Sequence, residues 1–342
     1  MSHFPINQDG TPQDTMSDHS STQTVVYGRV HNLQSIAVTA LAPPKDGYWV
    51  IFIHGGAWRD PAVTSSSFDA TKSILRDSSL PIAGFASISY RLSAHPNYPQ
   101  DPTNTAPKDF QDAKHPDHIR DVEAALAFLQ NTYAFGTRYI LVGHSCGATL
   151  AFQAVMGAVS HHREQAFVGS SDNSDKSIGF VSASPGPLPP ALTAQPTAIV
   201  GVAGIYDLRR LRDTHADISA YQEFIAGAFG ADEVLWDGIS PAQMAGSRGV
   251  EGGWKSGRLA VLAHSKDDEL VDGSQAEAMK ETLKNWEQTE AQIPKQELSH
   301  GGRRVCVLSI NGAHDEAWEN GEQLARAVSF AFEQLQDMGL AP

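Results

Sequence analysis

The sequence predicts an α/β protein built on one doubly wound, mostly parallel sheet of about eight strands. Short apolar runs rich in β-branched residues recur along the chain, and from Tyr48 onward most are continuous, as in strands buried on both faces. Amphipathic segments with helical spacing lie between them, so strand and helix alternate. The expected strands are residues 35–41, 48–53, 85–90, 139–142, 197–203, 259–263 and 305–310.

Two segments carry the helical pattern most clearly, and two others interrupt the alternation. Asp117 is expected to cap a helix whose apolar residues are Ile119, Val122, Ala125, Leu126 and Leu129, and residues 316–335 show similar amphipathicity. Residues 94–114 follow a strand without periodicity, which predicts a long loop at the edge of the sheet where α/β proteins bind ligands. The polar and proline-rich segment 161–196 is expected to be an exposed insertion.

Length and composition favour one domain over residues 25–342, preceded by a disordered polar tail over residues 1–24. The tail has no basic end and no apolar stretch, and no segment approaches the ~20 apolar residues of a membrane span, so we expect a cytoplasmic protein without a membrane partner. The net charge of -14 argues against nucleic acid. Cys146 and Cys306 support neither a disulfide framework nor a CxxC site.

The strongest chemical signal is the pentapeptide GHSCG at residues 143–147, which lies between the expected strand 139–142 and a helical segment at 148–155. In a GxSxG turn the serine backbone is strained, and the glycines avoid collisions with the neighbouring strand and helix. Ser145 is therefore the candidate nucleophile, and the amide of Cys146 would face an oxyanion. An ordinary strand-to-helix turn could use the same residues. We interpret the Cys146 side chain as core packing rather than as a nucleophile.

A serine nucleophile of this kind needs a base and an acid, which follow it in the chain on loops after late strands. His314 follows the run 305–310, and both Asp267 and Asp268 follow the run 259–263. Any one of the 14 histidines would by itself be assigned to the surface or the core, but the joint order favours a triad. No metal-ligand spacing such as HExxH occurs, so we expect no metal and assign structural or surface positions to His115, His118, His161, His162 and His264.

The strand 48–53 ends in the sequence HGGAW at residues 54–58. Small residues there let backbone amides approach a substrate carbonyl, and one such donor is typically worth ~10²–10³ in rate. A glycine turn or a phosphate-binding loop would be the plain alternatives, but no GK[ST] follows. The sequence therefore predicts a second contribution to an oxyanion hole.

At HGGAW the chain resembles the kynurenine formamidase (arylformamidase) family, within the HGG group of hormone-sensitive-lipase-like hydrolases, whose esterases usually carry HGGG. The resemblance extends through YRL at 90–92, GHSCG, GIYDL at 204–208 and the segment 312–314. It implies the α/β-hydrolase fold, and it favours Asp268, three residues before Val271, as the acid. It also implies oxyanion donors at Gly56 and Ala57, supported by His54, Gly55 and Trp58.

The resemblance further implies cleavage of the formyl amide of N-formyl-L-kynurenine to L-kynurenine and formate, a step of tryptophan degradation toward NAD, without a cofactor. The substrate would be a small molecule, and a homodimer stays open. Tyr206 and Arg91 are the candidates for contacts with it, although the GIYDL and YRL segments fit a bracing role better. A general carboxylesterase shares every catalytic residue and remains the alternative. A binding protein on an inactive hydrolase scaffold would be expected to lack a triad member.

Overall fold

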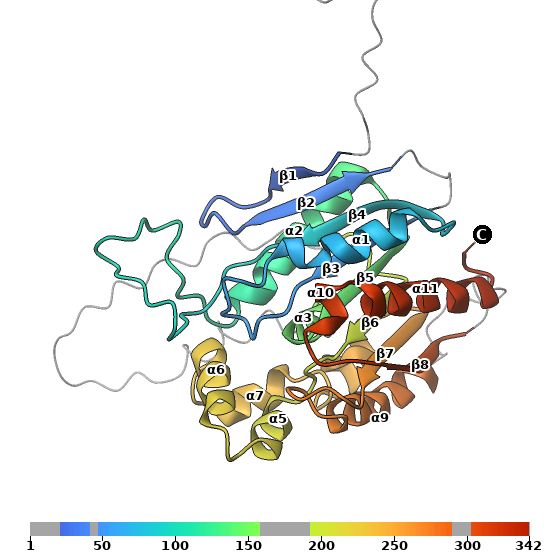
Figure 1. Cartoon of the computed structure of the whole chain (residues 1–342). Helices are drawn as coiled ribbons and strands as arrows, with labels where there is room; N and C mark the ends of the chain where they lie inside the picture. Colours follow the sequence, from blue (N-terminus) through green and yellow to red (C-terminus); the bar gives the residue numbers. More distant parts are fainter. Residues whose placement is uncertain (1–20, 42–46, 158–191, 289–301, 342) are drawn as a thin grey trace, which may run out of the picture.

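The computed structural model describes residues 21–41, 47–157, 192–288 and 302–341, and within them the chain forms one eight-stranded sheet (Figure 1). The strand order is β1-β2-β4-β3-β5-β6-β7-β8. The strands are β1 (Gln23–Val26), β2 (Ser35–Ala40), β3 (Tyr48–Ile53), β4 (Ile82–Ile88), β5 (Tyr139–His144), β6 (Ala198–Val202), β7 (Leu259–Ser265) and β8 (Arg304–Ile310).

The sheet is mostly parallel, as predicted. β1 pairs with β2 and β2 with β4 in the antiparallel sense, whereas every pairing from β4 to β8 is parallel. Each residue of β3, β5 and β6 is buried, which explains why these segments are continuous apolar runs rather than alternating ones. The prediction of an α/β fold with a doubly wound sheet is confirmed.

Helices cover both faces of the sheet (Figure 1). One apolar cluster joins the sheet to α1, α10 and α11, and a second cluster on the opposite face joins it to α2, α3 and the helices between β6 and β8. The described helices are η1 (Ser65–Phe68), α1 (Asp69–Arg76), α2 (Asp117–Tyr133), α3 (Cys146–Gln153), α5 (Leu208–Thr214), α6 (Ser219–Phe229), α7 (Glu233–Ile239), η3 (Gly246–Arg248), α8 (Val250–Gly253), α9 (Ser274–Gln288), α10 (Glu316–Glu319) and α11 (Glu322–Asp337).

Two helix predictions are wrong in detail. The expected single helix 316–335 is broken between α10 and α11 at Gly321, whose φ of +76° favours glycine and whose added Cβ would lie 2.4 Å from the Thr71 amide nitrogen. Asp117 is the first residue of α2 rather than its cap, and the cap position is taken by Pro116 without a side-chain hydrogen bond. The acidic side chain still suits the positive end of the helix.

The expected boundaries of the N-terminal tail and of the insertion also change. Gln23 and Thr24, assigned to the tail, belong to β1 because β2 offers them an edge to pair with. At the end of the insertion Ala194 is fastened to the core, since its carbonyl accepts a hydrogen bond from the Tyr139 hydroxyl at 2.9 Å. The rest of the tail (1–20) and of the insertion (161–191) lies outside the described residues.

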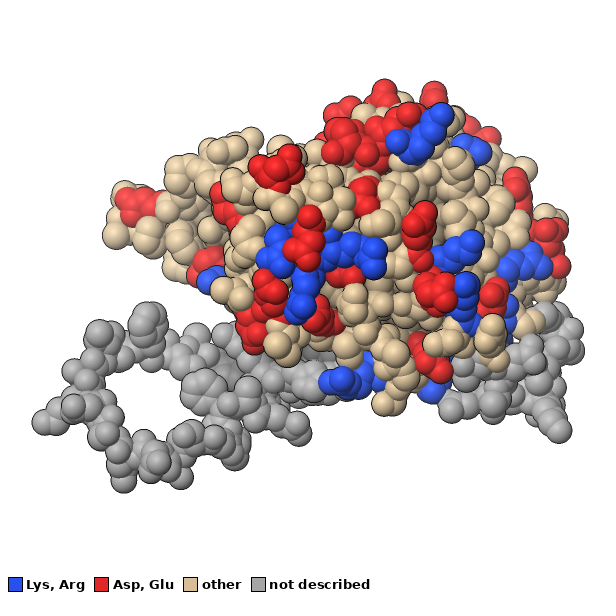
Figure 2. All heavy atoms as spheres, turned by 90° about the horizontal axis from the view of Figure 1, so that it is seen from below, with Lys and Arg blue, Asp and Glu red and all other residues tan. Residues whose placement is uncertain are grey.

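The parallel order brings the loops after β3, β5, β6, β7 and β8 to one edge of the sheet, where the predicted site residues lie. The loop 94–114 leaves β4 at this edge and contains no helix or strand, as predicted. Among the described residues no helix is long and apolar enough to span a bilayer. On the face seen in Figure 2, basic side chains lie directly beside acidic ones.

Candidate active site

Ser145 occupies a sharp turn between β5 and α3. Its backbone has φ 54° and ψ −124°, a strained conformation for a residue other than glycine. A Cβ on Gly143 would lie 2.4 Å from the carbonyl oxygen of Gly147, and a Cβ on Gly147 would lie 2.2 Å from that of Ile53 in β3. The two glycines of GxSxG are therefore required by contact with the helix and the neighbouring strand, as the sequence predicted.

The loops after β7 and β8 bring Asp268 and His314 together. His314 Nδ1 lies 3.0 and 2.9 Å from the two carboxylate oxygens of Asp268, and the side chains are 5% and 1% exposed. Burial acts to raise the pKa of Asp268, but hydrogen bonds and charge from His314 outweigh it and lower the pKa below its ordinary value. An ionised carboxylate only accepts, so His314 Nδ1 carries the proton in this pair.

Asp267, the alternative acid, is exposed on the same loop, and its amide donates to Ser265 Oγ at 3.1 Å. The structure thus brings Asp268, and not Asp267, to His314. Glu269 adds a contact that sequence reasoning missed, because its carboxylate accepts the His314 amide at 3.1 Å. No spacing rule could have indicated it, since the contact joins two loops.

The hydroxyl of Ser145 and the imidazole of His314 are not hydrogen-bonded to each other, so the expected direct contact is not formed. Each residue is about 5% exposed, and neither Ser145 Oγ nor His314 Nε2 has a partner among the described residues. Neither atom is sealed from solvent either. Catalytic hydrogen bonds often tighten only when substrate is bound, so the open arrangement is compatible with a nucleophile and its base.

His144, the residue before the candidate nucleophile, links the loops after β5 and β8 instead. Its Nε2 lies 3.1 Å from the His314 carbonyl oxygen, and the two rings are 4.7 Å apart. A carbonyl only accepts, so Nε2 carries the proton, and burial lowers the pKa of His144 to about 3, which keeps the ring neutral. The sequence analysis gave His144 no role, although its place inside GHSCG was visible.

The HGGAW loop turns back through three successive residues with positive φ: Gly56 at 89°, Ala57 at 48° and Trp58 at 60°. The amides of Gly56 and Ala57 donate to no backbone carbonyl, and neither does that of Cys146 at the start of α3. Gly55 packs against the nucleophile turn, since an added Cβ would lie 3.1 Å from Ser145 Cβ. The loop that carries Gly56 and Ala57 therefore packs against the Ser145 turn, and the amides of Ala57 and Cys146 act on the Cys146 thiol rather than on a backbone carbonyl.

Cys146 packs beneath this loop, as the sequence analysis expected. Its Sγ accepts the Trp58 amide at 3.3 Å and lies 3.6 Å from the Tyr90 hydroxyl. Burial raises the pKa of the Cys146 thiol to about 11, partly offset by these contacts, so it is not a thiolate at neutral pH. Tyr90 also donates to the His54 carbonyl at 3.0 Å and stacks on the His54 ring at 4.4 Å, which fixes the start of the loop.

The two candidates for substrate contact, Tyr206 and Arg91, are placed in the core and at a helix. The Tyr206 hydroxyl lies under β6, where a Cβ on Gly201 would be 2.1 Å from it, and the ring is 1% exposed. Arg91 donates Nε and Nη2 to the two oxygens of Asp121 in α2, each at 2.9 Å. Both segments therefore brace the structure, the role that the sequence analysis favoured for them.

Of the histidines assigned to structural or surface positions, His115 and His118 have structural surroundings. His118 is buried with its Nε2 3.1 Å from Ser93 Oγ, and His115 packs on the Phe229 ring at 5.8 Å. His264 is partly buried, whereas His161 and His162 lie outside the described residues. Three side chains could bring metal-ligating atoms within 4.8 Å of one another, namely those of His144, His314 and Asp315. Nε2 of His144 is already hydrogen-bonded to the His314 carbonyl, and Nδ1 of His314 is already hydrogen-bonded to Asp268.

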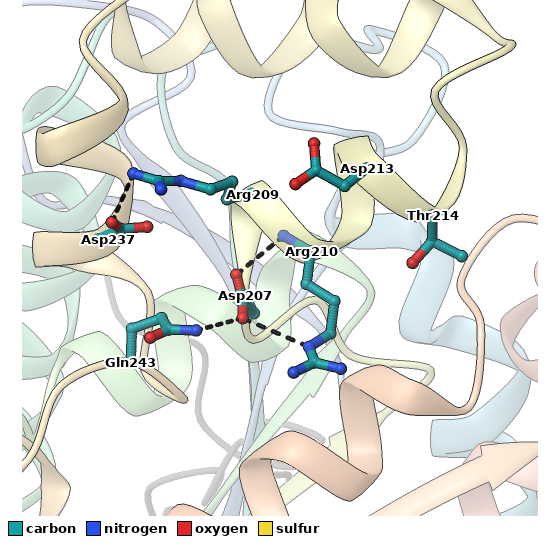
Figure 3. A pocket seen from close by; sticks show the side chains of 7 residues that line it. All are labelled: Asp207, Arg209, Arg210, Asp213, Thr214, Asp237 and Gln243. Atoms are coloured by element: carbon teal, nitrogen blue, oxygen red, sulfur yellow. Dashed lines mark hydrogen bonds and ion pairs between the residues drawn. The ribbon is translucent and has the colours of Figure 1, made fainter.

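An open surface pocket of about 500 Å³ lies beside α5, and none of its lining residues is Ser145, Asp268 or His314 (Figure 3). Its charges are paired: Arg209 bonds Asp237 at 2.6 Å, Arg210 lies 3.5 Å from Asp207, and Asp213 pairs with Arg212 outside the wall. Gln243 donates to Asp207 as well. The pocket therefore presents few unpaired charges to a ligand.

The chain is similar to known hydrolases over most of its length. A kynurenine formamidase-like hydrolase, fscH of Fusarium equiseti, is 38% identical over 86% of both chains. The kynurenine formamidase avaC of Aspergillus versicolor is 32% identical over 83% of this chain and 88% of its own. Among solved structures, an esterase from Thermogutta terrifontis aligns with a TM-score of 0.55 at 16% identity, covering 95% of each chain, which supports the fold alone.

A truncated carbohydrate esterase from gut microbiota superposes equally well, with a TM-score of 0.55 at 16% identity over 93% of this chain and 99% of its own. The model of one family, described as the alpha/beta hydrolase family, matches residues 50–327, a span that runs from β3 into α11 and contains every candidate site residue. The chain therefore belongs to the alpha/beta hydrolase family, among its kynurenine formamidase-like members.

Proposed function

We propose that this protein is a serine hydrolase that cleaves the formyl amide of N-formyl-L-kynurenine, releasing formate and L-kynurenine in the cytoplasm as a step of tryptophan breakdown. The observation that carries the proposal is the buried Asp268–His314 pair at the same sheet edge as the strained Ser145 turn. The relatives named kynurenine formamidase support the choice of substrate.

In the proposed reaction Ser145 Oγ attacks the formyl carbon while His314 Nε2 takes the hydroxyl proton. Asp268 holds Nδ1–H and stabilises the imidazolium that forms. The amides of Gly56, Ala57 and Cys146 donate to the oxyanion. His314 then passes its proton to the anilide nitrogen, so L-kynurenine leaves and a formyl-serine ester remains.

Water completes the cycle. His314 removes a proton from a water molecule, which attacks the formyl ester, and the second oxyanion uses the same amides. Collapse returns the proton to Ser145 Oγ and frees formate. The neutral state of His144 matters here, because a second positive charge beside His314 would oppose formation of the imidazolium.

Rates on N-formyl-L-kynurenine and on short and long p-nitrophenyl esters test the proposal directly. We expect the formamide to be the preferred substrate by kcat/KM, and we expect Ser145→Ala to lower turnover on the order of 10⁶-fold. Activity of Ser145→Ala near the wild-type rate would reject the nucleophile. A strong preference for the esters would reject the formamidase and leave a carboxylesterase.

A further inference from the structure

Helix α6 spans the site from one side to the other. At one point of the helix the Tyr221 hydroxyl donates to the Leu270 carbonyl at 2.7 Å, in the loop after β7. At its end the Phe229 ring packs edge-on against Trp58 at 4.8 Å, in the loop after β3. Since β5 and β6 lie between β3 and β7 in the sheet, α6 bridges the edge that carries Ser145.

An ion pair joins α6 to the residue that follows the HGGAW loop. Arg59 Nη1 lies 2.5 Å from Glu223 Oε1, and the guanidinium lies 5.8 Å from the centre of the Phe224 ring. Arg59 directly follows Trp58, and its amide donates to the Gly56 carbonyl at 2.9 Å. The guanidinium therefore extends from the same turn that carries the candidate oxyanion amides.

Both partners have unused hydrogen-bonding capacity. The Arg59 side chain is only 14% exposed, yet Nε and Nη2 have no partner among the described residues and are not sealed from solvent. Glu223 is 55% exposed and its Oε2 has no partner there either. A guanidinium presents a planar fork that suits a carboxylate, and a carboxylate accepts from an ammonium group.

A third segment lies near the pair. His95, in the loop 94–114, is partly buried, and its ring packs on that of Tyr98 at 5.0 Å. Burial lowers the pKa of His95, and the charge of Arg59 lowers it further, while Asp60 and Glu223 act in the opposite direction. Residues from two loops (Arg59 and His95) and from helix α6 (Glu223) thus lie close enough to interact electrostatically. An exposed ion pair typically adds only about 0–1 kcal/mol of stability. Stabilisation of α6 therefore does not by itself explain why Arg59 and Glu223 are paired here.

We propose that Arg59 and Glu223 form the subsite that binds the α-amino-acid end of the substrate, with Arg59 on the carboxylate and Glu223 on the ammonium group. The inference rests on the proposed function, because it requires the scissile formamide to be attached to an amino acid. In N-formyl-L-kynurenine the formamide and the amino-acid side chain extend from neighbouring ring carbons. The Arg59–Glu223 pair extends from the turn that carries the candidate oxyanion amides, so it is suitably placed to hold the amino-acid group while the formamide reacts.

The test compares two formamides. N-formyl-L-kynurenine carries the amino acid, whereas 2-formamidoacetophenone has the same ring, ketone and formamide without it. We expect Arg59→Gln to raise KM for N-formyl-L-kynurenine on the order of tenfold to a hundredfold, and to change kcat/KM for the neutral formamide only a few-fold. Arg326→Gln, at an exposed position of α11 on the other face, is the matched control.

A charge-swapped double variant, Arg59→Glu with Glu223→Arg, separates recognition from docking of α6. It keeps an ion pair but exchanges the positions of the two charges, so we expect no recovery of KM for N-formyl-L-kynurenine. Recovery, or an equal loss on both formamides in Arg59→Gln, would reject the subsite and leave a structural ion pair. If the wild type hydrolyses esters but neither formamide, the proposed function itself fails. A wild type that cleaves both formamides equally well rejects the subsite alone.

Discussion

Replacement of Asp268 by asparagine changes one atom and tests the catalytic arrangement most sharply. Asp268 Oδ1 accepts the amides of Leu270 and Val271 at 3.0 and 2.8 Å, and the asparagine oxygen can keep both bonds. The new NH₂ group then occupies the position of Oδ2 and faces His314 Nδ1. The NH₂ group repels a proton on Nδ1, and the remaining amide oxygen, 3.0 Å from Nδ1, is uncharged and already accepts two backbone amides. The tautomer protonated at Nε2, which accepts from the NH₂ group through Nδ1, is therefore favoured.

An imidazole protonated at Nε2 cannot accept the proton of Ser145. By analogy with the aspartate of other serine triads, Asp268→Asn should lower kcat about 10⁴-fold, equivalent to about 5.4 kcal/mol in activation free energy. Asp267→Asn is the control, since Asp267 is exposed and does not contact His314. The assay is the initial rate of formamide hydrolysis, with thermal unfolding to verify folding. A loss under tenfold in Asp268→Asn, or a larger loss in Asp267→Asn, would refute the reasoning.

Two further predictions concern stability. Gly147→Ala should lower the unfolding free energy on the order of 3 kcal/mol because its Cβ would meet the Ile53 carbonyl at 2.2 Å, whereas Gly227→Ala in α6 meets nothing within 4 Å and should be neutral or stabilising in urea denaturation. The free energy of unfolding should also fall as the pH drops below 6.5, because histidines that are protonated in the unfolded chain stay neutral when they are buried in the folded protein. Burial lowers their pKa values to about 4 or 3 in His54, His118 and His144. Glu123, whose pKa burial raises to about 7, opposes one of the three, which leaves roughly 2.7 kcal/mol per pH unit between pH 6.5 and 4.5. A flat or rising stability over that interval would contradict this accounting.

The nucleophile turn could be predicted because its constraints are local. The positive φ at Ser145 and the close approaches at Gly143 and Gly147 follow from a strand that must become a helix within a few residues. The order of serine, acid and histidine follows equally from the alternation of strand and helix, since parallel strands deliver their following loops to one edge. Sequence periodicity therefore placed Ser145 and His314 on the correct edge of the sheet.

Other features depend on contacts between distant segments, which spacing does not encode. Asp267 and Asp268 are adjacent in sequence, and only the direction of the loop after β7 makes Asp268 face His314. The small strand β1 has no strong pattern of its own and forms because β2 offers it an edge. Arg91 is a plausible substrate contact by sequence, but in the structure its guanidinium is hydrogen-bonded to the carboxylate of Asp121 in α2.

The sequence by itself determined the fold class and indicated a hydrolase, because backbone strain, glycine contacts and strand burial depend on neighbouring residues. Only the tertiary structure decided which acid faces the base, that His144 ties the nucleophile turn to the His314 loop, and that α6 brings Glu223 to Arg59. These pairings join loops that meet only after the sheet has assembled, so their geometry is a property of the packed molecule.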